Sequence, residues 1–207
     1  MEISYLGHSS FKIKGKTTTV VTDPFLQKCE ADIVTISHHH SDHDQIKLVA
    51  GSPYIIDGPG EYEVKGVSVI GVASWHDDQS GAKRGANTIY VVEIDGLRVC
   101  HLGDLGHKLA DTQLEELGSI DIVLVPVGGE YTIDAKAAAE VAKQVDPWIV
   151  IPMHYQQPGL DATMFGKLAG VDAFLKEMGK DVAPIPRLII SRDKLPQESQ
   201  IVVLERK

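Results

Sequence analysis

Hydrophobic and polar residues alternate with a period of two in the first part of the chain. The segments 3–6, 11–14 and 17–22 have this pattern, and turns containing Gly7 and Gly15 separate them. Such alternation is typical of strands with one buried face, and a glycine turn between two such strands is typical of a hairpin. We therefore predict that the chain begins with an antiparallel hairpin sheet.

Other apolar segments show no alternation. Residues 31–36, 120–126 and 148–152 are short runs rich in Val and Ile, a pattern that indicates strands covered on both faces. Further strands are predicted at 54–56, 67–72, 88–94, 97–102, 188–190 and 201–204. The Asp95-Gly96 pair predicts a tight hairpin turn, because both residues tolerate the positive φ angles that such a turn requires.

Helical patterns are concentrated in the second half of the chain. Helices are predicted at 42–50, 109–117, 134–145 and 164–178, with Asp134 as an N-terminal cap. No repeat or linker interrupts the pattern, so we expect a single domain over residues 1–207. Strands that dominate early and alternate with helices later predict a mixed α/β fold (α+β), a sheet sandwich flanked by helices.

The composition is that of a folded, acidic protein. Of 207 residues, 43% are hydrophobic and 24% charged, which excludes disorder as the main state. The net charge of −9 argues against nucleic acid as a partner, because a nucleic-acid surface needs a basic stripe. No apolar run reaches the roughly 18 residues of a membrane span, and no secretory signal follows Met1. The expected location is therefore the cytoplasm, without a membrane partner.

Histidine is the unusual residue of this sequence. Four of the nine histidines lie between positions 38 and 43, and they form an H-x-H-x-D-H pattern of His38, His40, Asp42 and His43. After a strand, two imidazoles at i and i+2 can converge on one ion, while the later Asp and His turn toward a second. Imidazole and carboxylate without thiolate suit Zn, Mn or Fe(II). The pattern therefore predicts a metal site.

Three further candidate ligands follow predicted strands. His76, Asp104 and His154 each lie just beyond the carboxyl end of a strand, where an open sheet places its ligands. Any one of them alone would be explained as a cap or a satisfied polar group. Together they would complete two coordination shells.

These motifs, with Asp23 in Thr22-Asp23-Pro24, resemble in order the five motifs of the metallo-β-lactamase superfamily. The segments 6–11, 126–129 and 151–155 are most similar to the branch of L-ascorbate 6-phosphate lactonase-like proteins. The resemblance implies a four-layer αββα sandwich with the metals in a cleft along one edge.

The resemblance also implies a division of the ligands between two divalent metal ions, Zn first, with Mn or Fe as alternatives. One ion would be held by His38, His40 and His76, and the other by Asp42, His43 and His154. Asp104 would bridge the two. Asp23 would fix a ligand imidazole through its second ring nitrogen.

Two ions at this spacing can share a hydroxide and polarise the bond under attack. We therefore expect a hydrolase of a small ester, lactone or phosphoester, in which Asp42 or Asp104 also accepts a proton. His8, after the first strand, is expected either to contact the substrate or donate a proton, or to hold its turn. Lys83 and Arg84 are the nearest basic pair for an anionic small-molecule substrate.

Three other functions compete with this hypothesis: a metal-dependent nuclease or phosphodiesterase acting on nucleic acid, a diiron-like redox protein, and a non-catalytic metal-binding module. His40 stands where diiron relatives usually carry Glu, which argues against the redox alternative. Formation of a homo-oligomer is left open. Among the remaining candidates, His39 is expected to be structural, His101 to lie in the core or behind the ligands, His107 and Glu130 on the surface, and Tyr155 to serve packing.

Overall fold

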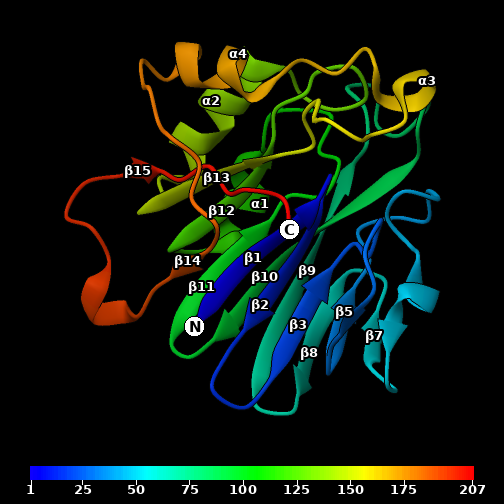
Figure 1. Ribbon diagram of the computed structural model, residues 1–207, viewed down its shortest axis with the longest axis vertical. Coiled ribbons are helices and arrows are strands. Elements are labelled where there is room, and N and C mark those ends of the chain that lie inside the picture. Colours follow the sequence, from blue (N-terminus) through cyan, green and yellow to red (C-terminus); the bar gives the residue numbers. More distant parts are fainter.

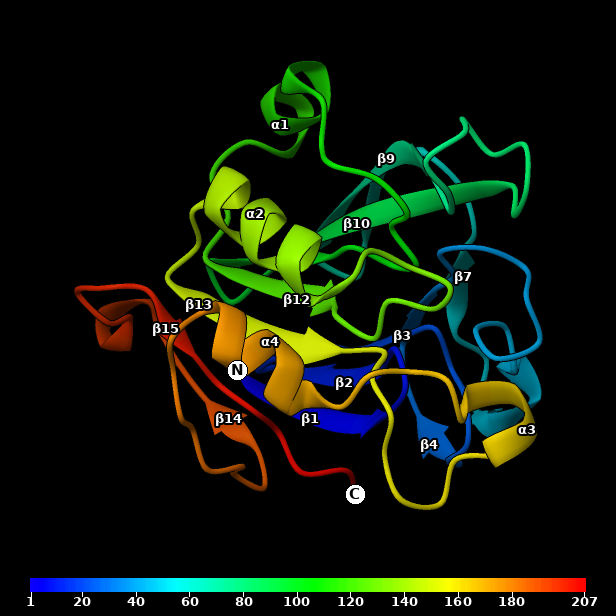
Figure 2. The same cartoon turned by 90° about the horizontal axis from the view of Figure 1, so that it is seen from above.

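The computed structural model describes residues 1–207, and its centre is a pair of β-sheets packed face to face (Figures 1 and 2). The first sheet has the order β14-β1-β2-β3-β5-β7. Its strands are β1 (Glu2–Gly7), β2 (Ser10–Lys14), β3 (Thr19–Thr22), β5 (Ile33–Thr35), β7 (Tyr54–Ile56) and β14 (Leu188–Ile189). The predicted hairpins are present: β1, β2 and β3 are antiparallel, whereas β3, β5 and β7 run parallel.

The second sheet has the order β15-β13-β12-β11-β10-β9-β8. Its strands are β8 (Gly60–Val64), β9 (Val67–Trp75), β10 (Ala86–Ile94), β11 (Leu97–His101), β12 (Ile122–Pro126), β13 (Ile149–Met153) and β15 (Gln200–Ile201). At the β10–β11 turn, Asp95 and Gly96 have φ angles of +54° and +75°, as the tight-turn prediction requires. The strands β11, β12 and β13 are parallel.

The α-helices α1 (Asp111–Leu117) and α2 (Ala135–Val145) pack on the second sheet. α1 contacts β9, α2 contacts β12, and α4 (Val171–Glu177) packs on α2. Asp134 caps α2 as predicted, because its carboxylate accepts from the N–H of Ala137. The outer face of the first sheet is covered instead by a short 3-10 helix, η1 (Ile46–Leu48), and by the paired strands β4 (Cys29–Glu30) and β6 (Val49–Ala50). A second 3-10 helix, η2 (Arg192–Lys194), lies near the end of the chain. The expected fold class, sheets flanked by helices, is confirmed.

The period-two pattern decides which side chains enter the core. In β5, Ile33 joins the large apolar cluster between the sheets, whereas Val34 joins a small cluster on the outer face with Ile36 and Val49. Successive side chains of a strand point to opposite faces. The continuous apolar run 31–36 therefore belongs to a strand covered on both faces, as expected.

Two predicted helices differ from the structure. The segment 42–50 contains no α-helix but only η1 and the short strand β6. The residues before η1 form a loop, in which the N–H of His43 donates to His40 O and the N–H of Gln45 to Pro24 O. The segment 164–178 is split into α3 (Ala162–Phe165) and α4. Gly166 ends α3 and Gly170 precedes α4, and glycine is a poor residue for a helix interior.

The strands that run parallel within each sheet end at a common edge. The carboxyl ends of β1, β3 and β5 meet those of β9, β11 and β13 there, and hydrogen bonds join the two sheets: Tyr90 Oη donates to Ile36 O, and the N–H of Thr88 to Ser37 O. The residues that follow these strands are therefore gathered at one place. No helix of the structure is both long and apolar enough to cross a membrane.

Candidate metal centre

The edge formed by the two sheets collects all seven predicted ligands. The loop after β5 carries His38, His40, Asp42 and His43, while His76 follows β9, Asp104 follows β11 and His154 follows β13. Residues more than 100 positions apart in the chain are thus brought together by strand direction alone. The prediction that ligands lie beyond strand ends agrees with this placement.

The first group consists of His38, His40 and His76. One ring nitrogen from each lies within 4.8 Å of the others, close enough for all three to bind a single ion. The rings of His38 and His40 are nearly perpendicular, with centroids 4.6 Å apart, so their nitrogens converge rather than stack. This is the group expected for the first ion.

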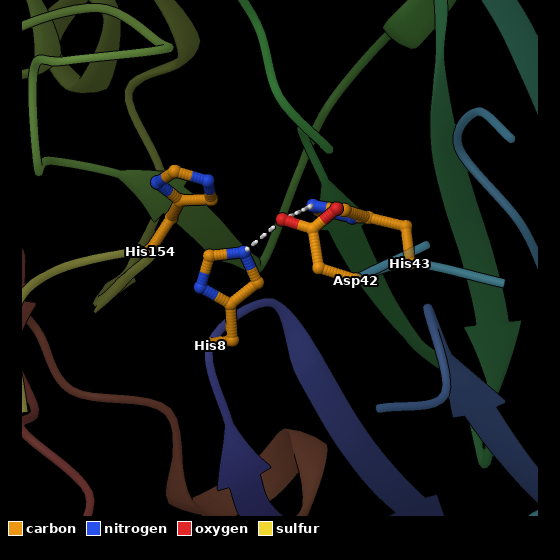
Figure 3. A group of neighbouring side chains, drawn as sticks. All are labelled: His8, Asp42, His43 and His154. Carbon is orange, nitrogen blue, oxygen red and sulfur yellow. Dashed lines mark hydrogen bonds and ion pairs between the residues drawn. The ribbon is translucent and has the colours of Figure 1, made fainter. Parts of the chain in front are cut away.

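The second group consists of Asp42, His43 and His154, joined by His8 (Figure 3). One ligand atom from each of the four lies within 4.8 Å of the others. In Figure 3, His8 rises from the β1–β2 turn toward Asp42, and His154 lies beside it on the segment that follows β13. The three residues expected for the second ion are therefore neighbours, and His8 is an additional member that the ligand pattern did not include.

Asp104 lies between the two groups. Its Oδ2 is 3.2 Å from Nε2 of His76 and 3.9 Å from Nε2 of His38, both of the first group. The same oxygen is 3.1 Å from Nε2 of His154 and 3.3 Å from Nε2 of His43, both of the second group. A single carboxylate oxygen thus faces both sets of imidazoles, which is the position that a bridging ligand needs.

The donor atoms fit metal ions rather than a closed hydrogen-bond network. The Nε2 atoms of His38, His43 and His154 and the Oδ1 of Asp104 are buried and have no partner in hydrogen-bonding geometry, although the three nitrogens lie 3.1–3.9 Å from Asp104 Oδ2. A buried polar atom without a partner is costly, and native proteins avoid it unless a ligand supplies the contact. Imidazole nitrogens and carboxylate oxygens are the ligands that Zn, Mn and Fe share.

Asp23 supports the ligands from behind. This fully buried carboxylate accepts from His43 Nδ1 at 2.7 Å and from the N–H and Oγ of Ser37 at 2.7 Å and 2.6 Å. Because the Ser37 hydroxyl proton goes to Asp23, His38 Nδ1 donates to Ser37 Oγ at 2.9 Å. Both imidazoles are thereby oriented with Nε2 toward the centre, the arrangement that a carboxylate behind a ligand histidine produces.

The electrostatics of the centre favour a bound cation. Burial and the neighbouring His43 lower the pKa of His38 to about 3, so its ring is neutral, the form that binds a metal. Burial alone would disfavour a charge on His43, but the carboxylates of Asp104 and Asp23 outweigh it and hold the pKa of His43 well above its usual value. The negative surroundings of His43 therefore stabilise positive charge at Nε2, whether a proton or a metal ion.

His8 is buried beside the second group. Its Nε2 donates to Asp42 Oδ2 at 3.1 Å, and its ring centroid lies 4.1 Å from that of His154 and 4.7 Å from that of Phe165. Its carbonyl accepts from Tyr5 Oη and from the N–H of His154. Burial and the neighbouring His154 lower the pKa of His8 to about 4. His8 thus contacts a ligand side chain and also holds the turn.

The other histidines lie outside both groups. His39 is exposed and pairs with Asp44, and the buried His101 donates from Nε2 to Ser9 O, which fixes the turn that carries His8. His107 accepts from the N–H of Trp75 at the surface. Tyr155 packs near Tyr5, with ring centroids 6.2 Å apart. These placements agree with the structural roles expected for them.

A cleft of about 480 Å³ opens onto the centre, which is within the usual range for a small-molecule site. It is lined by His40, Ser41, Asp42, His76, Arg84, Asp104, Tyr131, Thr163, Met164 and Phe165. No pattern in the sequence predicted Tyr131 and Phe165 at this cleft. A role for Asn87, whose Oδ1 accepts from the N–H of Asp104, was also not predicted. No local pattern marks a side chain that bonds to the backbone of a residue 17 positions away.

The fold and this centre define the class of the protein. Residues 2–154 match the family model described as "Beta-lactamase superfamily domain". A crystal structure from Thermotoga maritima, of a protein placed in the metallo-beta-lactamase superfamily, is 40% identical with a TM-score of 0.82, covering 98% of this chain and 97% of that one. The chain therefore belongs to the metallo-β-lactamase superfamily.

Relatives narrow the assignment. A "UPF0173 metal-dependent hydrolase" from Thermococcus onnurineus is 32% identical, over 82% of this chain and 92% of the relative. Igni18, described as a metallo hydrolase from Ignicoccus hospitalis, is 22% identical with a TM-score of 0.65, covering 86% of this chain and 90% of that one, and shows the shared fold. Within the superfamily, this chain belongs to the UPF0173 family and is a metal-dependent hydrolase.

Proposed function

We propose that the protein is a dinuclear hydrolase that cleaves a small ester, lactone or phosphoester. The observation that carries the proposal is the position of Asp104 Oδ2, between 3.1 and 3.9 Å from the Nε2 atoms of four histidines in two separate groups. Such a carboxylate would hold two ions at once. The first ion is assigned to His38, His40 and His76 and the second to Asp42, His43 and His154.

Two divalent ions at this centre would supply an activated water and polarise the oxygen of the bond to be cleaved. Asp42 is the proton acceptor that faces the cleft, and His8 holds its carboxylate in place. Asp104 faces four imidazoles, so its role would be to bind metal and not to accept a proton. Zinc is favoured because the donors are mainly imidazoles, and the Thermotoga maritima relative is described as a candidate Zn-dependent hydrolase.

The size and charge of the cleft support a small substrate. A volume of about 480 Å³ accommodates a small molecule, and Arg84 is the only basic side chain other than histidine that lines it. A nucleic-acid backbone would need several cations along a groove. The similarity of the turn around His8 to lactonase-like proteins favours a lactone among the esters to be tested.

The proposal is tested by metal analysis and a substrate screen. The protein is purified without a histidine tag and reconstituted anaerobically with Zn, Mn or Fe(II). We expect close to two ions per chain and turnover of at least one ester, lactone, phosphomonoester or phosphodiester. Fewer than one ion with every metal, or activity on nucleic acid alone, would contradict the proposal.

His8→Ala is expected to lower turnover by on the order of 10²-fold at saturating metal, the low end for the loss of a group that takes part in proton transfer. The reason is that Asp42, the acceptor, loses the donor that orients it. Because His8 has a φ of +58°, His8→Asn is made in parallel, since Asn tolerates this conformation better than Ala.

Metal content, melting temperature and turnover are measured on the same preparations of both variants. Bound metal should stay close to two ions per chain. A lower melting temperature with unchanged turnover per folded molecule would show that His8 only holds its turn. Loss of one ion would show instead that His8 is needed to form the second site.

A further inference from the structure

Arg84 is a cation without an acidic partner beside the metal centre. The structure contains no ion pair to Arg84, whereas Arg98, Arg187 and Arg192 each pair with a carboxylate. The nearby Glu130 carboxylate is engaged by Lys167. Arg84 therefore brings an uncompensated positive charge to the cleft that also contains Asp42 and Asp104.

The guanidinium of Arg84 is held in place by two contacts. Its Cζ lies 4.9 Å from the centre of the Tyr131 ring, and its Nη2 donates to Glu130 O at 3.3 Å. Tyr131 is itself fixed, because its Oη donates to the carbonyl oxygen of Met164, which also lines the cleft. Nη2 uses only one of its two N–H groups, and Nε and Nη1 make no hydrogen bond within the chain, so the second Nη2 N–H and a neighbouring donor form a free edge of the guanidinium for a ligand.

The backbone that carries Arg84 is organised by Asp77. We call residues 77–85 the Asp77 loop. The Asp77 carboxylate accepts four backbone N–H groups of this loop, from Gln79, Gly81, Lys83 and Arg84, at 2.8–2.9 Å. Burial opposes a charge on this group, yet the four donors lower the pKa of Asp77 to about 2.

The conformation of the Asp77 loop depends on glycine and on His76. Gly81 has a φ of +81°, and a Cβ at this position would lie 2.6 Å from the Trp75 ring. The loop closes where the N–H of His76 donates to Gly85 O at 3.1 Å. The loop thus follows the proposed ligand His76 and carries Arg84 near its other end, so the position of Arg84 relative to the centre is fixed.

We propose that Arg84 binds an anionic group of the substrate, a carboxylate or phosphate that is not part of the bond to be cleaved. Asp77 is the positioning residue for Arg84. This proposal rests on the proposed hydrolase function and names its substrate class. A planar guanidinium donates two parallel hydrogen bonds to a carboxylate or phosphate, which a neutral amide cannot accept as a charged pair. The preferred substrate is therefore an ester or lactone that carries a negative charge at its far end.

The test compares substrates that differ only at that end. The metal-loaded protein is given the 4-nitrophenyl monoester of adipic acid, whose far end is a carboxylate. It is also given two analogues of this ester, in which a primary amide or a phosphate replaces that carboxylate. The wild type should have a lower KM for the charged esters than for the amide. Arg84→Met should raise KM for the charged esters by on the order of 10- to 100-fold, as expected for a lost charged hydrogen bond. Its kcat, and its KM for the amide ester, should change little.

Two variants serve as controls for charge. Arg84→Lys should recover part of the preference for the charged esters, because it restores the charge without the planar donor pair. Lys83, the other member of the predicted basic pair, lines an adjoining cavity and not the cleft, so Lys83→Met should leave every KM unchanged. Equal KM changes for charged and neutral esters in Arg84→Met, or no change at all, would overturn the proposal while leaving the hydrolase function intact.

A binding measurement decides the proposal even if none of these esters is cleaved. Calorimetry is carried out with adipate and with adipamate, in which one carboxylate is replaced by an amide. The wild type should bind adipate more tightly, and Arg84→Met should bind the two equally. If the wild type makes no distinction between them, Arg84 does not recognise the anion.

The positioning role of Asp77 is tested by Asp77→Ala, with its exposed neighbour Asp78→Ala as the matched control. Asp77→Ala should raise KM for the charged esters with little change in kcat, and both variants should keep their metal. The control should behave as the wild type. Loss of metal in Asp77→Ala would show that the Asp77 loop positions His76 and not Arg84. An unchanged KM would show that Asp77 does not position Arg84.

Discussion

Asp104→Ala is expected to deplete both metal sites at once and to lower turnover by more than about 100-fold. The loss of a ligand should cost more than the loss of a group behind a ligand, which lowers activity by about 10- to 100-fold. The physical reason is geometric, because Asp104 Oδ2 faces His38 and His76 of one group and His43 and His154 of the other. Bound metal per chain and turnover are measured after dialysis against limiting zinc.

The comparison variant for Asp104 is His76→Ala, which removes a ligand of the first group only. It should lose chiefly one ion, whereas Asp78→Ala, an exposed neighbour, should lose none. Equal depletion of both ions in His76→Ala would mean that the assigned division of ligands is wrong. Retention of two ions in Asp104→Ala would show that this carboxylate does not bridge.

Asp23→Ala is expected to destabilise the protein by about 3–5 kcal/mol, the usual cost of removing one partner of a buried charged pair. Asp23 is fully buried and accepts from His43 and Ser37. Although burial opposes its charge, the neighbouring imidazoles of His43 and His101 hold its pKa below the usual value. Metal affinity should also fall by about 10- to 100-fold, because His43 and His38 lose their orientation.

A matched control for Asp23 exists on the surface. Asp44 also accepts from the Nδ1 of a histidine, His39, at 3.0 Å, but this pair is exposed. Asp44→Ala should change the free energy of unfolding by less than about 1 kcal/mol, since exposed ion pairs contribute little. Chemical denaturation and metal titration of both variants distinguish the effects. Similar unfolding curves for the two would show that the Asp23 network contributes no special stability.

The fold could be predicted where local chemistry alone decides the structure. The hairpin of β10 and β11 was predicted because Asp95-Gly96 fixes the turn, and α2 because Asp134 caps it. The helix predicted at 42–50 was wrong, because polar residues that permit a helix form the ligand loop there. The strand β8 (Gly60–Val64) was not predicted. β8 pairs with β9, and only Tyr62 and Val64 of its five residues are partly buried, so it offers too few apolar positions to mark a strand.

The sequence by itself determined the chemistry of the centre: which residues are imidazoles and carboxylates, and that each follows a strand. Strand ends are local features, and the direction of the strands then brings His76, Asp104 and His154 to the loop of His38. The tertiary structure alone decided that His8 contacts Asp42, that Asn87 holds the backbone of Asp104, and that the Arg84 guanidinium lies against the Tyr131 ring. These contacts join different loops and sheets, and no spacing along the chain encodes a distance across a packed core.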